Sequence, residues 1–208
     1  MGIIRGSATF TRFTVTEPLP EDYIENFPNS ILRYAFRPLG EDSDAERSAG
    51  WVNILDMFDS QFNAMEFFKD PYIAMSLRID ARSVPSKALK QYCRDAEEDI
   101  RIAENLPFLN RERRLELKEI IHARLLRRAI PRSNTYDMIW NLDTGVVLFG
   151  SVNSKLSDEF SEMFLKTFGM NVNPLFPYSL GLAAAEKERL SPGRIDEIVP
   201  LNLGGYEV

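Results

Sequence analysis

Residues 136–149 read Tyr-Asp-Met-Ile-Trp-Asn-Leu-Asp-Thr-Gly-Val-Val-Leu-Phe. The first five and the last four of these residues are mostly aromatic or β-branched, and such side chains favour strands. The Asn-Leu-Asp-Thr-Gly segment between them is a turn sequence, because glycine readily adopts the positive φ of tight hairpin turns. The stretch therefore predicts a β-hairpin with strands over 136–140 and 146–149.

Two helices are predicted upstream of this hairpin. The Ser-Val-Pro-Ser sequence at 83–86 ends a strand and starts a helix over 87–105, which Leu-Pro then breaks. Asn110 caps a second helix over 111–128, and a proline three residues later ends it. Because the connection is short, we expect an antiparallel helical hairpin. Apolar residues recur at helical spacing on the second helix: Leu117, Ile120, Ile121, Leu125 and Ala129.

Strands and helices are also expected on either side of this unit. β-rich or alternating patterns predict strands over residues 3–15, 32–37, 51–55, 72–81 and 172–175. Helical patterns are found over residues 20–30, 156–168 and 186–189, with Gly169 at the end of the second. The acidic residues 41–46 are interpreted as a loop. This order predicts an α+β fold, in which a mixed or antiparallel sheet carries a projecting antiparallel helical hairpin.

The predicted organisation is a single region over residues 1–208. Residues 1–85 and 133–180 are expected to form the sheet-containing body, residues 86–132 the helical projection, and residues 181–208 a tail. Composition is that of an ordinary globular protein. The single cysteine, Cys93, excludes a disulfide within the chain. No signal peptide or membrane-spanning run is evident, so we expect a cytoplasmic protein without membrane contact.

Charge is segregated along the chain. Residues 111–132 contain eight basic and three acidic residues, a charge of +5, which leaves −11 for the rest of a chain of net charge −6. Such segregation suits contact with a phosphate backbone, for which arginine is the best-shaped cation. The basic residues are Arg111, Arg113, Arg114, Lys118, Arg124, Arg127, Arg128 and Arg132.

A solvated helix face laced with ion pairs is the alternative interpretation of this segment. Glu112 and Glu116 lie at helical spacing from basic neighbours, which favours that alternative. The end of the segment fits it less well, because four arginines there have no acidic residue within four positions: Arg124, Arg127, Arg128 and Arg132. Whether Arg78, Arg82, Lys87 and Lys90 extend the basic surface stays open.

No pattern for catalysis or metal binding emerges. Asp95, Glu97, Glu98 and Asp99 form a cluster on one predicted helix, where consecutive side chains point in different directions, so we interpret them as a solvated face. His122 is the only histidine, and a structural or surface role suits it best. Phosphate-loop and dinucleotide motifs are absent. Four phenylalanines are interpreted as core rather than base-stacking residues: Phe58, Phe62, Phe67 and Phe68.

Several segments, in this order, resemble the family of the recombination-associated protein RdgC. No segment is specific alone, and their collinear order over about residues 1–180 carries the resemblance. Members of the family are longer at the C-terminal end, so we expect a shortened form that lacks the C-terminal region. The matching segments are Gly50–Val52, Tyr72–Leu77, Val84–Ser86 with Lys90, Leu125–Arg132, Met138–Gly145, and Asp158–Phe168 with Pro174.

The resemblance implies an α+β protein that forms a ring-shaped homodimer around duplex DNA. It also implies binding without sequence preference and restraint of the RecA recombinase. Ile130 matches an apolar family position at the end of the helical projection, where an aromatic side chain contacts the other subunit. Arg128 and Arg132 flank it, as basic residues do in the family. An exonuclease label is attached to the family, but these residues supply no such chemistry.

Three functions follow from these observations. The first is a sequence-nonspecific, nucleoid-associated DNA-binding protein of recombination, a homodimer with double-stranded DNA and RecA as partners. The second is a protein-interaction module that keeps the fold and dimerises without binding DNA. The third is a metal-dependent nuclease. We favour the first, and we expect no enzyme activity and no cofactor.

Overall fold

The computed structural model describes residues 3, 6, 9–41, 43–62, 65–189, 191 and 193. Seven strands in this part of the chain form one sheet, in the order β2-β4-β5-β6-β1-β7, and β3 pairs with β4. All of these strand pairs are antiparallel, which confirms the predicted α+β class. The strands are β1 Thr11–Thr14, β2 Arg47–Asn53, β3 Phe68–Lys69, β4 Tyr72–Ala81, β5 Arg132–Asn141, β6 Val146–Phe149 and β7 Asn173–Pro174.

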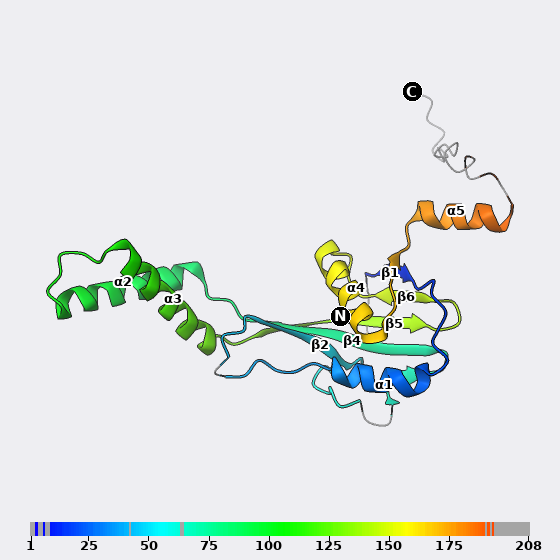
Figure 1. The fold of residues 1–208 in the computed structure, drawn as a ribbon, viewed down its shortest axis with the longest axis horizontal. Coiled ribbons are helices and arrows are strands. Elements are labelled where there is room, and N and C mark those ends of the chain that lie inside the picture. Colours follow the sequence, from blue (N-terminus) through cyan, green and yellow to red (C-terminus); the bar gives the residue numbers. More distant parts are fainter. Residues whose placement is uncertain are drawn as a thin grey trace.

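The central strands β4 and β5 pair along their whole length. Their register runs from Tyr72 opposite Asn141 to Ala81 opposite Arg132. The helices α2 (Ser86–Ala103) and α3 (Arg111–Arg128) connect these two strands. Figure 1 shows both helices extending away from the body at the end where β4 leaves the sheet and β5 enters it. The projecting helical hairpin is thus an insertion between two paired strands.

The core lies between the sheet and two helices, α1 (Tyr23–Arg33) and α4 (Ser154–Phe168). Aromatic rings fill this layer, because large rings bury the most apolar area per residue. Phe160 stacks on Phe149 with ring centroids 4.2 Å apart, and Trp140 lies 5.0 Å from Phe164. The buried Trp51 indole N–H donates to Thr167 Oγ1 over 2.7 Å, which satisfies its polar atom inside the core.

Local signals placed most of these elements correctly. Strand β4 and helix α3 have the predicted bounds, and the Asn110 side chain accepts a hydrogen bond from the Arg113 backbone N–H at 2.8 Å. Gly169 ends α4 with a φ of 70°, as its position predicted. In the turn of the β5–β6 hairpin, Gly145 has a φ of 69° and lies so close to Val15 that a Cβ would meet its carbonyl oxygen.

Three predicted elements differ from the structure, and for the first of them a tertiary contact is the reason. The strand expected over 32–37 does not form, since α1 continues to Arg33 and only Ala35 bridges β2. Gly50 explains the close passage of this segment, because a Cβ there would lie 2.5 Å from the Phe36 backbone. The strand expected over 3–15 is confined to β1 among the described residues.

The third error concerns the last helix. Helix α5 covers Pro177–Lys187 and begins nine residues before the segment expected over 186–189. Its start carries a signal that could have placed it, because proline is favoured at the first helical position. From residue 194 on, the tail expected over 181–208 lies outside the described residues, and α5 occupies its first residues.

Candidate nucleic-acid interface

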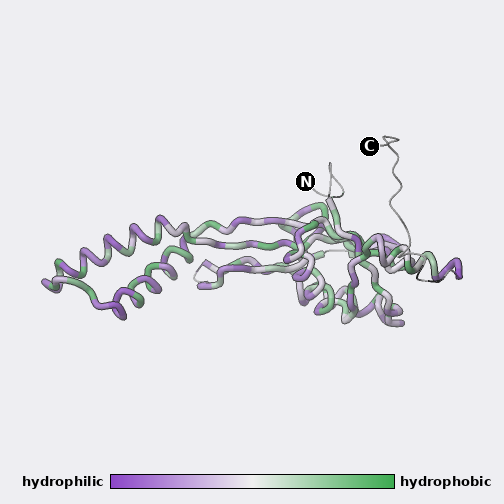
Figure 2. Tube along the Cα trace, turned by 90° about the horizontal axis from the view of Figure 1, so that it is seen from above, coloured by the Kyte–Doolittle hydropathy of each residue, from purple (hydrophilic) through white to green (hydrophobic). Residues whose placement is uncertain are grey.

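The helical hairpin has little buried surface of its own. No residue of α2 is buried, and in α3 only Ile121 and Leu126 are. The predicted apolar face is therefore only partly correct, because Ile120 is 66% exposed. Figure 2 shows hydrophilic positions dominating both helices. Most side chains of the hairpin, including its basic ones, are thus accessible to a partner.

Three of the eight basic residues singled out in the sequence form ion pairs. Arg113 pairs with Glu104 across the tip of the hairpin, and Arg114 Nε lies 2.9 Å from Glu97 Oε1 on α2. Glu104 has a pKa below its ordinary value, because Arg113 donates hydrogen bonds to it and adds a positive charge. The alternative interpretation, a helix face with ion pairs, is therefore correct for these two arginines.

The third ion pair connects the hairpin to the acidic loop, residues 41–46. Arg127 donates two hydrogen bonds to Asp44, at 2.7 and 3.0 Å. The hydrogen bonds and charge of Arg127 hold the pKa of Asp44 below its ordinary value. These partners are 83 positions apart in sequence, so no search for neighbours at helical spacing could have found the contact.

The other five basic residues make no ion pair with any residue that the structure describes. Four are exposed along α3, and the fifth is the first residue of β5. These side chains are solvated and are not paired with carboxylates. Contact with a phosphate would therefore break no ion pair of the described chain. The five are Arg111, Lys118, Arg124, Arg128 and Arg132.

Two grooves between α2 and α3 collect part of the basic set. The outer groove has a volume of about 510 Å³ and includes Arg114 and Lys118 from α3. The inner groove lies next to the strand that enters α2, has a volume of about 430 Å³, and includes Arg124 and Arg128 beside Tyr92. The structure thus places four of the eight predicted residues in two grooves of the same hairpin.

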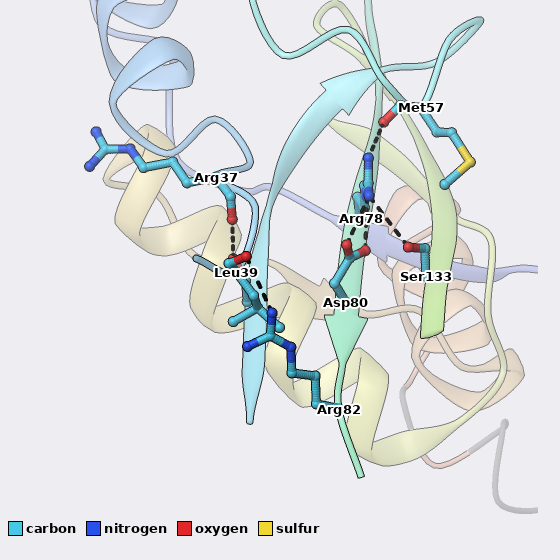
Figure 3. A network of polar contacts seen from close by, with 8 residues as sticks. Arg37, Leu39, Met57, Arg78, Asp80, Arg82 and Ser133 are labelled. Atoms are coloured by element: carbon cyan, nitrogen blue, oxygen red, sulfur yellow. Dashed lines mark hydrogen bonds and ion pairs between the residues drawn. The ribbon is translucent and has the colours of Figure 1, made fainter. Parts of the chain in front are cut away.

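Two of the residues left open by the sequence belong to the body and not to this surface. Arg78 donates to Asp80 in two hydrogen bonds of 2.8 Å and to the Met57 carbonyl at 3.0 Å, as Figure 3 shows. Its guanidinium lies 4.2 Å from the ring centre of Phe36. Arg82 is 7% exposed and donates to backbone carbonyls near residue 40. Both arginines are therefore engaged in internal contacts.

Lys87 and Lys90 are different, because both are exposed on α2. Lys90 lines the outer groove together with Arg94, a basic residue that the sequence interpretation missed. The signal that could have found Arg94 is its spacing of four from Lys90, which places both side chains on one face of the helix.

The acidic residues of α2 do not converge. Asp95, Glu98 and Asp99 are exposed, and Glu97 is half-buried beside Arg114. Among the described residues, no group of three or more His, Cys, Asp or Glu side chains could hold a metal ion. His122, on α3, is half-buried. These carboxylates therefore offer no assembled site for metal-dependent chemistry in the described part of the chain.

The remaining singled-out residues lie in different surroundings. Phe62 and Phe67 are buried as predicted, but Phe58 is 78% exposed, so its assignment to the core was wrong. Ile130 follows the end of α3 and is 89% exposed. Within the described ranges, no helix has an apolar stretch long enough to cross a membrane.

Comparison with known proteins identifies the family. No curated protein matches the chain. A family model described as "Putative exonuclease, RdgC" matches residues 10–183, which span the whole sheet, both helices of the hairpin and most of α5. The match covers far more than half of the 208 residues. The chain therefore belongs to the RdgC family.

Proposed function

We propose that the chain is a recombination-associated protein that binds double-stranded DNA without sequence preference through the basic residues of its helical hairpin. The observation that carries the proposal is the set of five basic residues, on and directly after α3, that form no ion pair among the described residues. Membership of the RdgC family supports the recombination-associated role. Binding would place the protein on the nucleoid.

Lack of sequence preference follows from the type of contact. Arginine and lysine bind phosphate oxygens, which position a protein on the duplex but carry no sequence information. DNA covered in this way is less accessible to other proteins that need the same backbone. Restraint of RecA is therefore proposed to arise from competition for DNA, and a homodimer would double the number of phosphate contacts.

The direct test is fluorescence anisotropy of the purified protein with a labelled random-sequence duplex. The logarithm of the binding constant should fall linearly with the logarithm of salt concentration, with a slope of about −0.9 per phosphate contact. Five contacts would give a slope of roughly −4 to −5. Duplexes of unrelated sequence should bind equally well. Absence of binding at low salt would overturn the proposal.

A triple substitution identifies the surface. Replacing Arg124, Arg128 and Arg132 by alanine should weaken binding for every sequence and flatten the salt slope by up to about one unit per residue. The matched control replaces three exposed cations outside the hairpin by alanine and so changes the net charge by the same amount. These cations are Arg33, Lys155 and Lys187. Equal loss in both variants would mean that overall charge, and not the hairpin, drives binding.

A protein-interaction module is the second candidate, and the exposed apolar side chains of the hairpin favour it. Ile130 is 89% exposed, Ile120 66% and Leu115 52%. Covering large apolar side chains at this exposure with a partner removes apolar surface from water, which stabilises the complex. A dimer that light scattering detects, that Ile130→Asp disrupts, and that binds no DNA at low salt would establish this function in place of the first.

Catalysis is not part of the proposal. Two-metal nucleases need carboxylates that converge on one point, and among the described residues no three or more His, Cys, Asp or Glu side chains form such a group. Linear duplex incubated with the protein and Mg²⁺ or Mn²⁺ should stay at full length. Shortening of the duplex from its ends, dependent on the metal, would contradict this expectation.

A further inference from the structure

The outer groove of the helical hairpin concentrates positive charge from two helices. Lys90 and Arg94 of α2 face Arg114 and Lys118 of α3 across it, and among the described residues Glu97 is the only acidic one in its lining. On each helix the two basic residues are four positions apart, so their side chains lie on the same face. Five charged side chains thus give the groove a charge of +3.

Three of these four basic residues are available to a ligand. Lys90, Arg94 and Lys118 are exposed and form no ion pair in the part of the chain that the structure describes. Below them lie Leu89, Leu117 and the half-buried Cys93. Because four cations and a single carboxylate line this groove, its attraction for an anion is stronger than that of a surface on which opposite charges balance.

We propose that this groove binds backbone phosphates of nucleic acid, and that α2 contributes Lys90 and Arg94 to an interface that sequence alone assigns to α3. The inference rests on the proposed function. It adds two residues of α2 to the proposed DNA-binding surface and assigns them to the outer groove. A strand that crosses the hairpin here would contact both helices, and it would therefore hold them together as well as bind them.

Glu97 has a role in this groove as an internal competitor. Its Oε1 lies 2.9 Å from Arg114 Nε in an ion pair, with 30% of the Glu97 side chain exposed. A phosphate would have to replace that carboxylate before Arg114 could contact it. Glu97→Gln removes the charge while keeping the shape of the side chain, and it should therefore raise the affinity for DNA several-fold and steepen the salt dependence.

The binding test compares a double variant of the full chain with a control that removes one exposed cation from the same helix. Lys90→Ala and Arg94→Ala together should lower DNA affinity and flatten the salt slope by about two units, since each lost phosphate contact removes about 0.9. Neither change should unfold the helix, because no α2 residue is buried and alanine is the best helix former. Arg101→Ala is the control, an exposed cation on α2 outside the groove.

The outcomes separate this inference from the proposed function. A Lys90/Arg94 variant that binds like the wild type, while the Arg124/Arg128/Arg132 variant is weakened, would overturn the groove and leave DNA binding in place. Equal effects of the double variant and Arg101→Ala, counted per charge removed, would also overturn it. A wild-type chain that binds no DNA would overturn the proposed function itself.

Cys93 provides a second readout inside the groove. It is the only cysteine of the chain, so a thiol reagent reports on this place alone. Duplex DNA should slow alkylation of Cys93 by a neutral maleimide, and Lys90→Ala with Arg94→Ala should abolish that protection. Alkylation at the same rate with and without saturating DNA would show that the groove is empty in the complex.

Discussion

At the residue scale, Arg78 and Asp80 show how the body keeps charge inside a sheet. Both lie on β4, with 12% and 5% of their side chains exposed. Burial raises the pKa of Asp80, but the hydrogen bonds from Arg78 and Ser133 and the charge of Arg78 outweigh it, so its pKa lies below the ordinary 3.8. The carboxylate therefore stabilises the folded state above that value, and this contribution is lost as pH falls through the lower folded pKa.

Asp80→Asn should accordingly destabilise the protein at neutral pH, because it leaves the nearly buried Arg78 without its charged partner. Loss of one member of a buried pair costs about 3 kcal/mol or more. Urea unfolding should show this deficit at pH 7 and a smaller deficit below pH 4. Asp143→Asn, in the exposed β5–β6 turn, is the control. A deficit that is independent of pH would mean that charge is not the cause.

At the element scale, the acidic loop and the end of α3 are joined by Asp44 and Arg127. Asp44→Asn should release Arg127 from this ion pair, raise DNA affinity a few-fold, and steepen the salt slope by about one unit. Glu41→Gln removes the same charge from the same loop, and no ion pair of Glu41 occurs among the described residues. If both variants raise affinity equally, the loop acts through its overall charge and not through Arg127.

The same two elements show what sequence reasoning could and could not predict. Helix α3 was predicted with its bounds, because Asn110 and the proline after its end are local signals. Its basic residues were also found, but their environments were not, since Asp44 lies far away in sequence and Glu97 on another helix. The helix predicted over residues 20–30 ended too early for a related reason. Ile31 is fully buried in α1, and its burial depends on contacts that neighbouring residues in the sequence do not determine.

At the scale of the whole molecule, the core of the body is packed without side chains from the helical hairpin. Strands β4 and β5 remain paired up to Ala81 and Arg132, where the hairpin begins and ends. The core between the sheet and helices α1 and α4 contains no residue of α2 or α3. The body is therefore stabilised without the hairpin, and the proposed DNA contacts lie almost entirely on the hairpin.

Replacing residues 84–130 by a short Asn-Gly turn should consequently leave a folded body that no longer binds DNA. A two-residue turn can join antiparallel strands whose ends are already paired. Circular dichroism and urea unfolding should show a cooperative transition, because the aromatic core is intact. Anisotropy with the random duplex should show no binding at physiological salt. Retained binding would place the DNA surface on the body, whereas loss of the cooperative transition would show that the hairpin is needed for folding.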